Sequence, residues 1–143
     1  MLEILELNAI TDEVVAAFAR LIPQLSLAAP PGRQELEEIL ASQSSTLWVA
    51  KKAGQIIGTL TLVVFRTPTG RHAWIEDVVV DAAERRQGIG EALTRAALQR
   101  AADLGIKAVD LTSRPSRQEA NQLYLRLGFK LRQTNLYRLN LDH

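Results

Sequence analysis

The fold of this protein is decided by residues 72–90, which read HAWIEDVVVDAAERRQGIG. The first part is rich in β-branched and aromatic side chains and predicts a strand over residues 72–80. A short polar loop then leads into an apolar stripe at helical spacing, which predicts a helix over residues 88–104. Residues 107–112 predict another strand, with apolar side chains on one side. Because a strand, a helix and a second strand form a crossover connection, the two strands are expected to be a parallel pair.

The segments on either side of this crossover complete the expected sheet. β-branched and alternating residues before it predict two strands that form an antiparallel meander with the strand at 72–80. Thr11 is a suitable N-cap for a first helix. The other expected elements are strands at 4–7, 46–50, 56–65, 129–131 and 134–141, and helices at 11–22, 34–42 and 117–127. This order indicates an α/β (α+β) fold with a mixed, mostly antiparallel central sheet covered by helices.

Length and composition limit what the chain can be. Its 143 residues and mass of 15.8 kDa fit one domain over residues 1–143. The formal net charge of +1 gives no broad basic surface, so neither nucleic acid nor membrane is an expected partner. With no cysteine and two histidines, the chain has neither disulfides nor thiolate zinc sites, and no metal is expected. No signal peptide and no apolar run of about 20 residues is found, so a cytoplasmic location is expected.

The loop before the helix at 88–104 has the parts of an anion site. Gly88 and Gly90 allow the backbone to approach a ligand closely, and the first amides of a helix lack partners within the helix. The helix dipole favours negative charge at that end, and Arg85 and Arg86 add two flexible cations. These features favour binding of a phosphate or pyrophosphate. The alternative is an ordinary strand-to-helix turn with solvated arginines, since short glycine motifs also occur by chance.

Two motifs give the sequence a resemblance to a known superfamily. Arg85-x-x-Gly88-x-Gly90, after a strand that ends in Val-Val-Val, resembles motif A of the GNAT acyl-CoA N-acyltransferases. Asn121-x-x-Tyr124-x-x-x-Gly128-Phe129 resembles their second signature, a helix that bears tyrosine and ends in Gly-Phe. The order of elements is also similar across nearly the whole chain. The resemblance implies helices on both faces of the sheet and a splay between the two parallel strands.

The resemblance further implies that acetyl-CoA is the acyl donor. In such proteins the loop amides and arginines wrap the pyrophosphate, and the pantetheine arm pairs with the preceding strand like an additional strand. Carried over to this sequence, the cofactor-binding residues are Val78, Val79, Val80, Arg85, Arg86, Gln87, Gly88, Ile89, Gly90, Glu91, Asn121 and Tyr124. Asn121 is equally compatible with a polar helix face. Arg117 departs from the pattern, since many members have an asparagine there that contacts the cofactor.

The same resemblance implies direct attack of a neutral amine on the thioester. Tyr124 matches the family tyrosine and is the candidate general acid for the leaving thiolate, with a core tyrosine as the alternative. Glu76 is the candidate general base and Asp77 the second choice; a solvent-facing or arginine-paired carboxylate is the alternative. Regular alternation sends these two acids to opposite faces of the strand, unless a bulge intervenes. Backbone amides near Val78 and Val79 are expected to polarise the carbonyl.

The acceptor is expected to be a primary amine of a small molecule. Arg71, His72 and Trp74 are the candidate substrate-binding residues, because the chain before this strand is basic and Trp74 alternates with Glu76. A basic pocket would suit an anionic or phosphorylated amine. Residues 75–80 are similar to glucosamine-phosphate acetyltransferases of the superfamily, which favours an amino-sugar phosphate. Solvated arginines and a structural histidine are the alternatives.

Three other interpretations stay open. In the first, the acceptor is a protein or peptide amine. In the second, the chain is a non-catalytic acyl-CoA-binding sensor module, which needs Arg85 to Gly90 but neither candidate catalytic group. In the third, the loop is only a turn in a structural interaction domain. Relatives in this superfamily are often dimers, so a homodimer is a further expectation, with the C-terminal strands as a possible partner edge.

Overall fold

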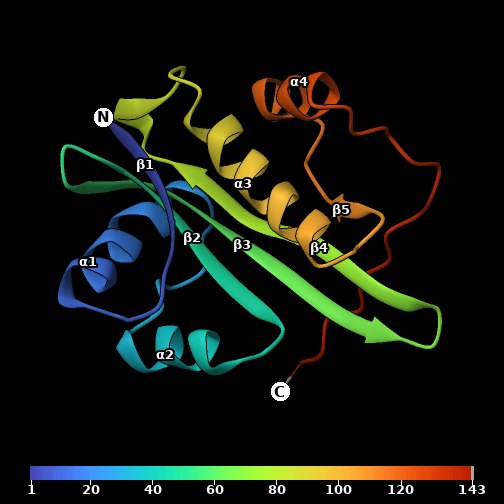
Figure 1. Ribbon diagram of the computed structural model, residues 1–143, viewed down its shortest axis with the longest axis horizontal. Coiled ribbons are helices and arrows are strands. Elements are labelled where there is room, and N and C mark those ends of the chain that lie inside the picture. Colours follow the sequence, from blue (N-terminus) through green and yellow to red (C-terminus); the bar gives the residue numbers. More distant parts are fainter. Residues whose placement is uncertain (143) are drawn as a thin grey trace. The chain divides into compact units, whose positions relative to one another are not determined.

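All five strands of the sheet lie in the first of two compact units, Met1–Thr112 (Figure 1). The computed structural model describes residues 1–142, and the second unit begins at Ser113. The strands are β1 Leu2–Glu6, β2 Ser45–Lys52, β3 Gln55–Thr67, β4 Gly70–Val80 and β5 Val109–Leu111. They are ordered β1-β2-β3-β4-β5, and every neighbouring pair is antiparallel except β4 and β5, which are parallel. The predicted mixed, mostly antiparallel sheet is confirmed.

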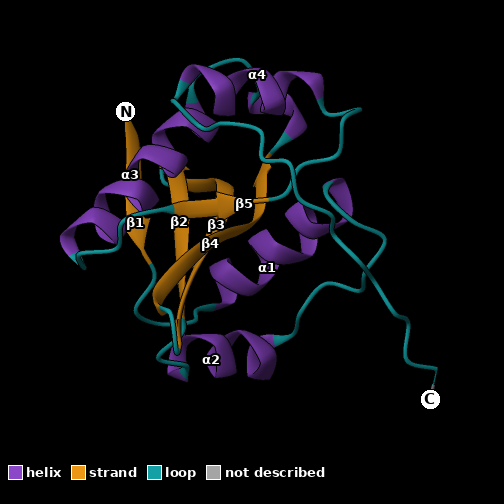
Figure 2. Cartoon of the chain, turned by 90° about the vertical axis from the view of Figure 1, so that its right-hand side faces the viewer, coloured by secondary structure: helices purple, strands orange, loops and turns teal. Residues whose placement is uncertain are grey.

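Helices cover both faces of this sheet. The helices of the first unit are α1 Asp12–Leu21, α2 Arg33–Ala41 and α3 Ile89–Asp103. Figure 2 shows α3 on one side of the strands and α1 on the other. Thr11 is the N-cap of α1, as predicted, because its hydroxyl accepts a hydrogen bond from the Val14 amide at 3.3 Å.

The core of the first unit has one layer on each face of the sheet. On one face, α1 and α2 pack on the strands through Ile10, Val14, Ala17, Phe18, Leu21, Ile22, Leu36, Leu47, Val49, Ile56 and Val79. On the other face, α3 buries Leu93 and Ala97 completely. Gly58 of β3 lies beneath α3, since a Cβ there would lie 3.3 Å from Leu93 Cδ1 and 3.2 Å from the Val79 carbonyl oxygen. This glycine lets α3 approach the sheet beside the end of β4.

The described part of the second unit contains one helix, α4 Gln118–Arg126. Beyond its end, the Phe129 amide donates a hydrogen bond to the Tyr124 carbonyl oxygen at 3.0 Å. The Phe129 ring also meets the Tyr124 ring edge to face, with 5.7 Å between the centroids. The predicted helix that bears tyrosine and ends in Gly-Phe is confirmed.

The two strands predicted after α4 are wrong. Residues 129–131 and 134–141 form no backbone ladder with any described strand. A strand is stable only when it is paired, and an alternating pattern supplies no partner by itself. Five large apolar side chains after Phe129 are therefore 73–95% exposed: Leu131, Leu136, Tyr137, Leu139 and Leu141. One domain over residues 1–143 stays a prediction.

Candidate active site

β4 carries a β-bulge in its second half. Thr61 of β3 lies opposite Glu76, but Thr59 lies opposite Val79. One residue of β3 therefore faces two residues of β4. Asp77 takes up the irregularity with a φ of 51°, a left-handed conformation that aspartate tolerates better than most residues. Bulges of this kind re-aim side chains and are common next to active sites.

The bulge places Glu76 on the face of the sheet that α1 and α2 cover. Thr59 and Thr61 are two residues apart on β3, so they and their partners on β4 share one face. Glu76 and Val79 consequently point the same way, although a spacing of three would separate them in a regular strand. Val79 belongs to the core cluster formed with α1 and α2. The sequence predicts Glu76 and Asp77 on opposite faces only if β4 has no bulge. A bulge is present, so regular alternation does not hold in this half of β4.

The surroundings of Glu76 raise its pKa above the ordinary value of a glutamate. Partial burial is the larger cause, and the negative charge of Asp77 is the second. The Glu76 side chain nevertheless keeps access to solvent. A higher pKa makes a carboxylate a stronger proton acceptor, which suits a general base that works near neutral pH.

β4 and β5 separate where the bulge begins. Their parallel pairing joins Ala73–Ile75 to Val109–Leu111 and extends no further. The other edge of β4 stays paired with β3 as far as Val80. From Glu76 to Val80, the edge of β4 toward β5 therefore has no strand partner among residues 1–142. This is the splay predicted for the parallel pair, and an extended ligand can add to such an edge as a strand does.

The loop after β4 has the backbone conformation of an anion site. It passes through one turn of 3-10 helix, Ala82–Glu84, and then through two left-handed residues, Arg86 at φ 65° and Gly88 at φ 77°. Such turns gather successive backbone amides into a concave site for anions. α3 begins at Ile89, and its N-cap Gly88 has no side chain to bind the first amides of the helix. A Cβ on Gly88 would meet no atom within 4 Å, so the space around this residue is open.

Side chains of this loop differ in what they offer a ligand. Arg85 Nε donates a hydrogen bond to the Val80 carbonyl oxygen at 3.3 Å, which holds one cation at the end of β4. The Ile89 side chain is buried, so only its backbone can meet a cofactor. The Glu91 carboxylate lies in the first turn of α3 and forms an ion pair with Arg95 at 3.0 Å. The positive charge of Arg95 partly offsets the negative charge of Glu91 there.

Comparison with known proteins identifies the chain. The profile of the Acetyltransferase (GNAT) family matches residues 7–129, from the end of β1 through α4. The chain belongs to this family. The resemblance inferred from the two motifs is thereby confirmed.

This GNAT protein is similar in sequence to mammalian N-acetyltransferases and in fold to two solved structures, one from a soil metagenome and one from a plant. Rat N-acetyltransferase 8 is 39% identical over 93 residues, 64% of this chain and 42% of that protein, and human N-acetyltransferase 8 is 34% identical, with 64% and 41% covered. The chain thus spans about two fifths of the length of these curated relatives. An aminoglycoside acetyltransferase from an uncultured soil metagenomic sample has a TM-score of 0.83 at 23% identity, covering 99% of this chain and 97% of its own. Glucosamine-6-phosphate N-acetyltransferase from Arabidopsis thaliana has a TM-score of 0.80 at 19% identity, covering 97% and 98%. These two structures share the fold.

The three candidate substrate-binding residues lie in different places in this GNAT fold. The Arg71 guanidinium donates to the Leu104 carbonyl oxygen at 2.9 Å, so it caps the end of α3 on the face opposite Glu76. His72 Nε2 lies at 2.8 Å from the Thr67 hydroxyl oxygen, in the hairpin that joins β3 and β4. Four residues of strand place it about 13 Å from Glu76.

Trp74 is the one candidate of the three that lies beside Glu76. It is two residues away on the regular part of β4, so both side chains share a face. The Trp74 side chain is half-buried and offers a large apolar surface next to the candidate base. Substrate binding by all three residues stays a prediction, which this geometry favours for Trp74.

Within the second unit, Tyr124 is 7% exposed. Burial raises the pKa of its phenol, and the nearby charge of Arg117 partly opposes that effect. The phenol therefore carries its proton throughout the neutral pH range, as a general acid must. The Asn121 amide nitrogen donates to the carbonyl oxygens of Arg114 and Arg117, both at 2.9 Å, so it organises the start of α4.

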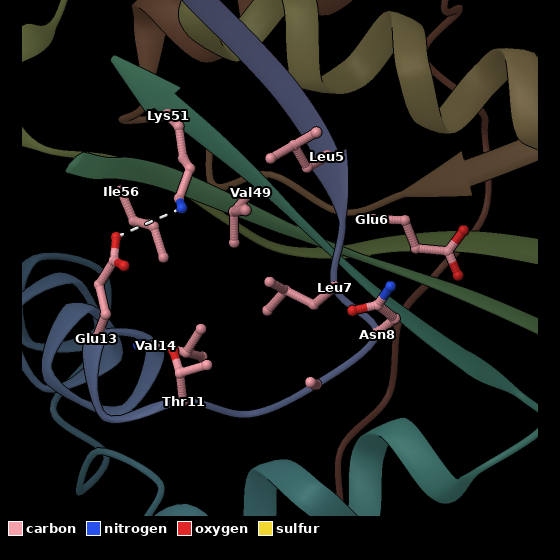
Figure 3. Close-up of a pocket in the computed structure, with 11 residues that line it drawn as sticks. Leu5, Glu6, Leu7, Asn8, Thr11, Glu13, Val14, Val49, Lys51 and Ile56 are labelled. Carbon is pink, nitrogen blue, oxygen red and sulfur yellow. Dashed lines mark hydrogen bonds and ion pairs between the residues drawn. The ribbon is translucent and has the colours of Figure 1, made fainter. Parts of the chain in front are cut away.

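A pocket of about 320 Å³ lies between β1, α1 and β2 (Figure 3). Its walls are mainly apolar, and Figure 3 shows the Lys51 ammonium directed at the Glu13 carboxylate, 3.6 Å away. The sequence analysis did not predict this pocket. Two strands of the sheet, β2 and β3, separate β1 from β4, so this pocket is not part of the candidate site around Glu76.

No cluster of three or more His, Asp or Glu side chains in residues 1–142 is arranged to hold a metal ion. No described helix has both the length and the apolar character that a membrane crossing requires.

Side chains from outside the loop of residues 81–90, which we call the anion loop, hold it in place and were not predicted from the sequence. Lys52 ends β2, and its ammonium contacts Glu84 and Gln87 of the loop. Arg20 of α1 contacts Asp81 at the start of the loop. No signal in the sequence identifies them, because they are separated from their partners by 32 to 61 residues.

Proposed function

We propose that this GNAT protein transfers an acetyl group from acetyl-CoA to a primary amine of a small molecule by direct attack. One observation carries the proposal: the unpaired edge of β4, from Glu76 to Val80, runs directly into the anion loop of residues 81–90. A ligand with an extended amide arm and a pyrophosphate has this same order of parts. Acetyl-CoA is such a ligand and supplies an activated thioester.

The residues present fit acetyl-CoA on two counts. Backbone groups of Val78 and Val80 lie on the part of β4 that β5 leaves unpaired, where a pantetheine arm would add as a strand. The amides at the start of α3, together with Arg85 and Arg86, offer donors and positive charge to the pyrophosphate. The open space around Gly88 admits the phosphate groups.

In this proposal Glu76 accepts the proton of the acceptor ammonium, directly or through water. Its raised pKa and its exposure on the face that α1 and α2 cover support that role. Asp77 contributes by its charge, because it raises the pKa of its neighbour. We assign polarisation of the thioester carbonyl to backbone amides near Val78 and Val79. Tyr124 returns a proton to the leaving sulfur, and the raised pKa of its phenol supports that role.

A small-molecule acceptor is favoured by two structures of the same fold. Their names describe acetyltransferases of aminoglycosides and of glucosamine 6-phosphate, which are both amino sugars. A protein amine is the second candidate, because another structure of this fold, at a TM-score of 0.79, is a ribosomal-protein-alanine N-acetyltransferase. The case for a phosphorylated acceptor loses one cation, since Arg71 binds the end of α3.

The test is release of free CoA from acetyl-CoA in the presence of amines. The panel contains amino-sugar phosphates, aminoglycosides, polyamines, amino acids and peptides, and the R85A/R86A double variant is the control for the anion site. We expect turnover with at least one small amine and a large rise in the KM for acetyl-CoA in the double variant. Binding of acetyl-CoA without turnover on the whole panel would favour the sensor module. Absence of binding would overturn the proposal.

We further propose that two copies of this chain associate through residues 129–142. The segment has the alternating pattern of a strand, forms no ladder, and exposes Leu131, Leu136, Tyr137, Leu139 and Leu141. A strand of this character is stabilised when it pairs with the edge of a second chain. Light scattering after size exclusion should give a dimer mass. The L136D/L139D variant should then run as a monomer, and a monomeric parent chain would contradict the proposal.

A further inference from the structure

The anion loop, residues 81–90, is held from outside by a polar triangle at its centre. The ammonium of Lys52 lies 3.1 Å from Glu84 Oε2 and 2.7 Å from Gln87 Oε1. Gln87 Nε2 donates to the same carboxylate oxygen of Glu84 at 3.1 Å. Glu84 ends the 3-10 turn and Gln87 precedes the left-handed Gly88, so the triangle spans Arg86, the strained residue of the loop.

A second group of contacts holds the start of the loop. Arg20 Nε donates to Asp81 Oδ2 at 3.4 Å, and its Nη2 donates to the Ile56 carbonyl oxygen of β3. The other oxygen of Asp81 accepts from the Ala83 amide at 3.2 Å and so caps the 3-10 turn. Arg20 therefore ties the first turn of the loop to the sheet.

Gln24 adds to this second group. Its side-chain oxygen accepts a hydrogen bond from the Ala82 amide at 2.8 Å. Its nitrogen donates to the Arg20 carbonyl oxygen at 3.2 Å. Arg20 in α1 and Gln24 in the 3-10 turn Ile22–Gln24 that follows it therefore act on neighbouring positions of the loop.

The loop needs such support for two physical reasons. A left-handed conformation is strained for any residue except glycine, and Arg86 adopts it with φ 65°. A flexible loop also loses conformational entropy when it closes on a ligand, and that loss weakens binding. Contacts that hold the loop in its binding shape before the ligand arrives reduce both costs.

We infer that Lys52, Arg20 and Gln24 are positioning residues that preorganise the anion loop for the phosphates of the acyl donor. None belongs to a motif of the sequence, and each acts through loop residues. The inference rests on the proposed function only for the identity of the ligand as CoA. The competing explanation is that these contacts contribute to global stability alone.

Each of the two groups has a matched control. Lys51 is the neighbour of Lys52 on β2 and also forms an ion pair, at 3.6 Å, but with Glu13 of α1. Arg33 resembles Arg20 in bridging a carbonyl oxygen, that of Ile10, and a carboxylate, that of Asp12, at a place remote from the loop. The test variants are K52M and R20M, and the controls are K51M and R33M.

The first measurement is hydrogen exchange of the loop amides without any ligand. Amides of residues 82–88 should exchange faster in K52M and R20M than in the parent, and should be unchanged in K51M and R33M. K52R should restore the slow exchange, because arginine can reach the same two oxygens. Equal loop exchange in the parent, the two test variants and the two controls would overturn the inference, whatever the protein binds.

The second measurement is the Kd for CoA by calorimetry. An exposed ion pair contributes up to about 1 kcal/mol, so K52M should weaken binding by about fivefold. Hydrogen bonds to charged groups contribute more, so R20M should weaken it by about tenfold. If R20M fails to fold, Q24A tests the same part of the loop. Unchanged Kd values in K52M and Q24A would contradict the inference. A parent protein that does not bind CoA would contradict the proposed function instead, and the exchange data would still decide whether the loop is preorganised.

Discussion

The two halves of β4 belong to one continuous strand but differ in regularity and in pairing. From His72 to Ile75 the strand is regular and is paired on both edges, with β3 on one side and β5 on the other from Ala73. From Glu76 to Val80 it contains a bulge, a left-handed aspartate and one edge without a strand partner. The first half is a structural support, and the second half has backbone groups and a carboxylate that a ligand can use.

This difference shows how one strand can serve stability and chemistry at once. The bulge at Asp77 changes which face each later side chain meets, so Glu76 and Val79 share a face. The chain keeps Val79 in the core while it exposes Glu76 beside it. The strain and unpaired edge of the second half are tolerated because the first half and the core hold the strand in place.

The largest expected effect comes from removing the candidate base in the second half. General base catalysis contributes about 10²–10⁴-fold, so E76Q should lower kcat/KM by that range while the Kd for acetyl-CoA stays close to the parent value. Initial rates over a range of acceptor concentrations give kcat/KM, and calorimetry gives the Kd. D77N is the matched variant and should lose far less activity. Equal losses in both variants would contradict the assignment of the base to Glu76.

The regular half should respond in stability rather than in chemistry. Ile75 is 3% exposed, and truncating a buried isoleucine to alanine costs about 2–5 kcal/mol. Urea unfolding of I75A should show this loss, whereas its Kd for acetyl-CoA should stay within about twofold of the parent value. If the Kd rises in proportion to the lost stability, the two halves of β4 are not separable.

The bulge itself can be tested at Asp77. Its φ of 51° is strained for a β-branched residue and free of strain for glycine, so D77V should be less stable than D77G by about 1–2 kcal/mol. Thermal unfolding of the pair isolates the backbone effect, because both variants remove the same charge. A D77V variant as stable as D77G would mean that the strand is regular in solution.

The smallest expected effect is a pH dependence of stability. Since the folded state raises the pKa of Glu76, it favours the protonated form. That contribution to stability is fully present below the ordinary pKa of glutamate and is lost as pH rises through the raised pKa. The side chain of E76Q stays neutral, so the melting temperature of this variant should exceed that of the parent at pH 8, and the two should converge at acid pH. A constant difference at all pH values would contradict the pKa shift.

The pH dependence of the rate tests whether Asp77 raises the pKa of Glu76. The charge of Asp77 is one cause of the raised pKa of Glu76, so D77N should lower that pKa. The acid limb of the pH dependence of kcat/KM, where the base becomes protonated, should move to lower pH in D77N. An acid limb that stays in place would mean that another group is the base.

Much of the fold could be predicted from the sequence because the signals are local. Thr11 binds the first turn of α1 through an amide three residues away, and Gly88 adopts the left-handed conformation that precedes α3. The strands of the meander and their order follow from period and turn residues within short windows. The family also follows, since its two motifs are contained in the short stretches 85–90 and 121–129.

The errors and omissions all involve partners distant in the chain. Residues 134–141 have the pattern of a strand, but pattern alone does not create a neighbour for their backbone groups. Substrate binding by Arg71 stays a prediction, and the sequence did not show that its guanidinium donates to the Leu104 carbonyl oxygen, 33 residues away. Whether an arginine is solvated, structural or functional depends on which acceptor atoms the folded chain places within hydrogen-bond distance of its guanidinium.

By itself, the sequence determined the periodicity of the elements, their caps and the bend of glycines and arginines after β4, because each depends on residues a few positions apart. Only the tertiary structure decided which face Glu76 points to, since that depends on the register between β3 and β4. It also decided that Lys52 and Arg20 hold the loop. Register and ion pairs are long-range properties, and the free energy that selects them comes from the whole packed core rather than from any short stretch of the chain.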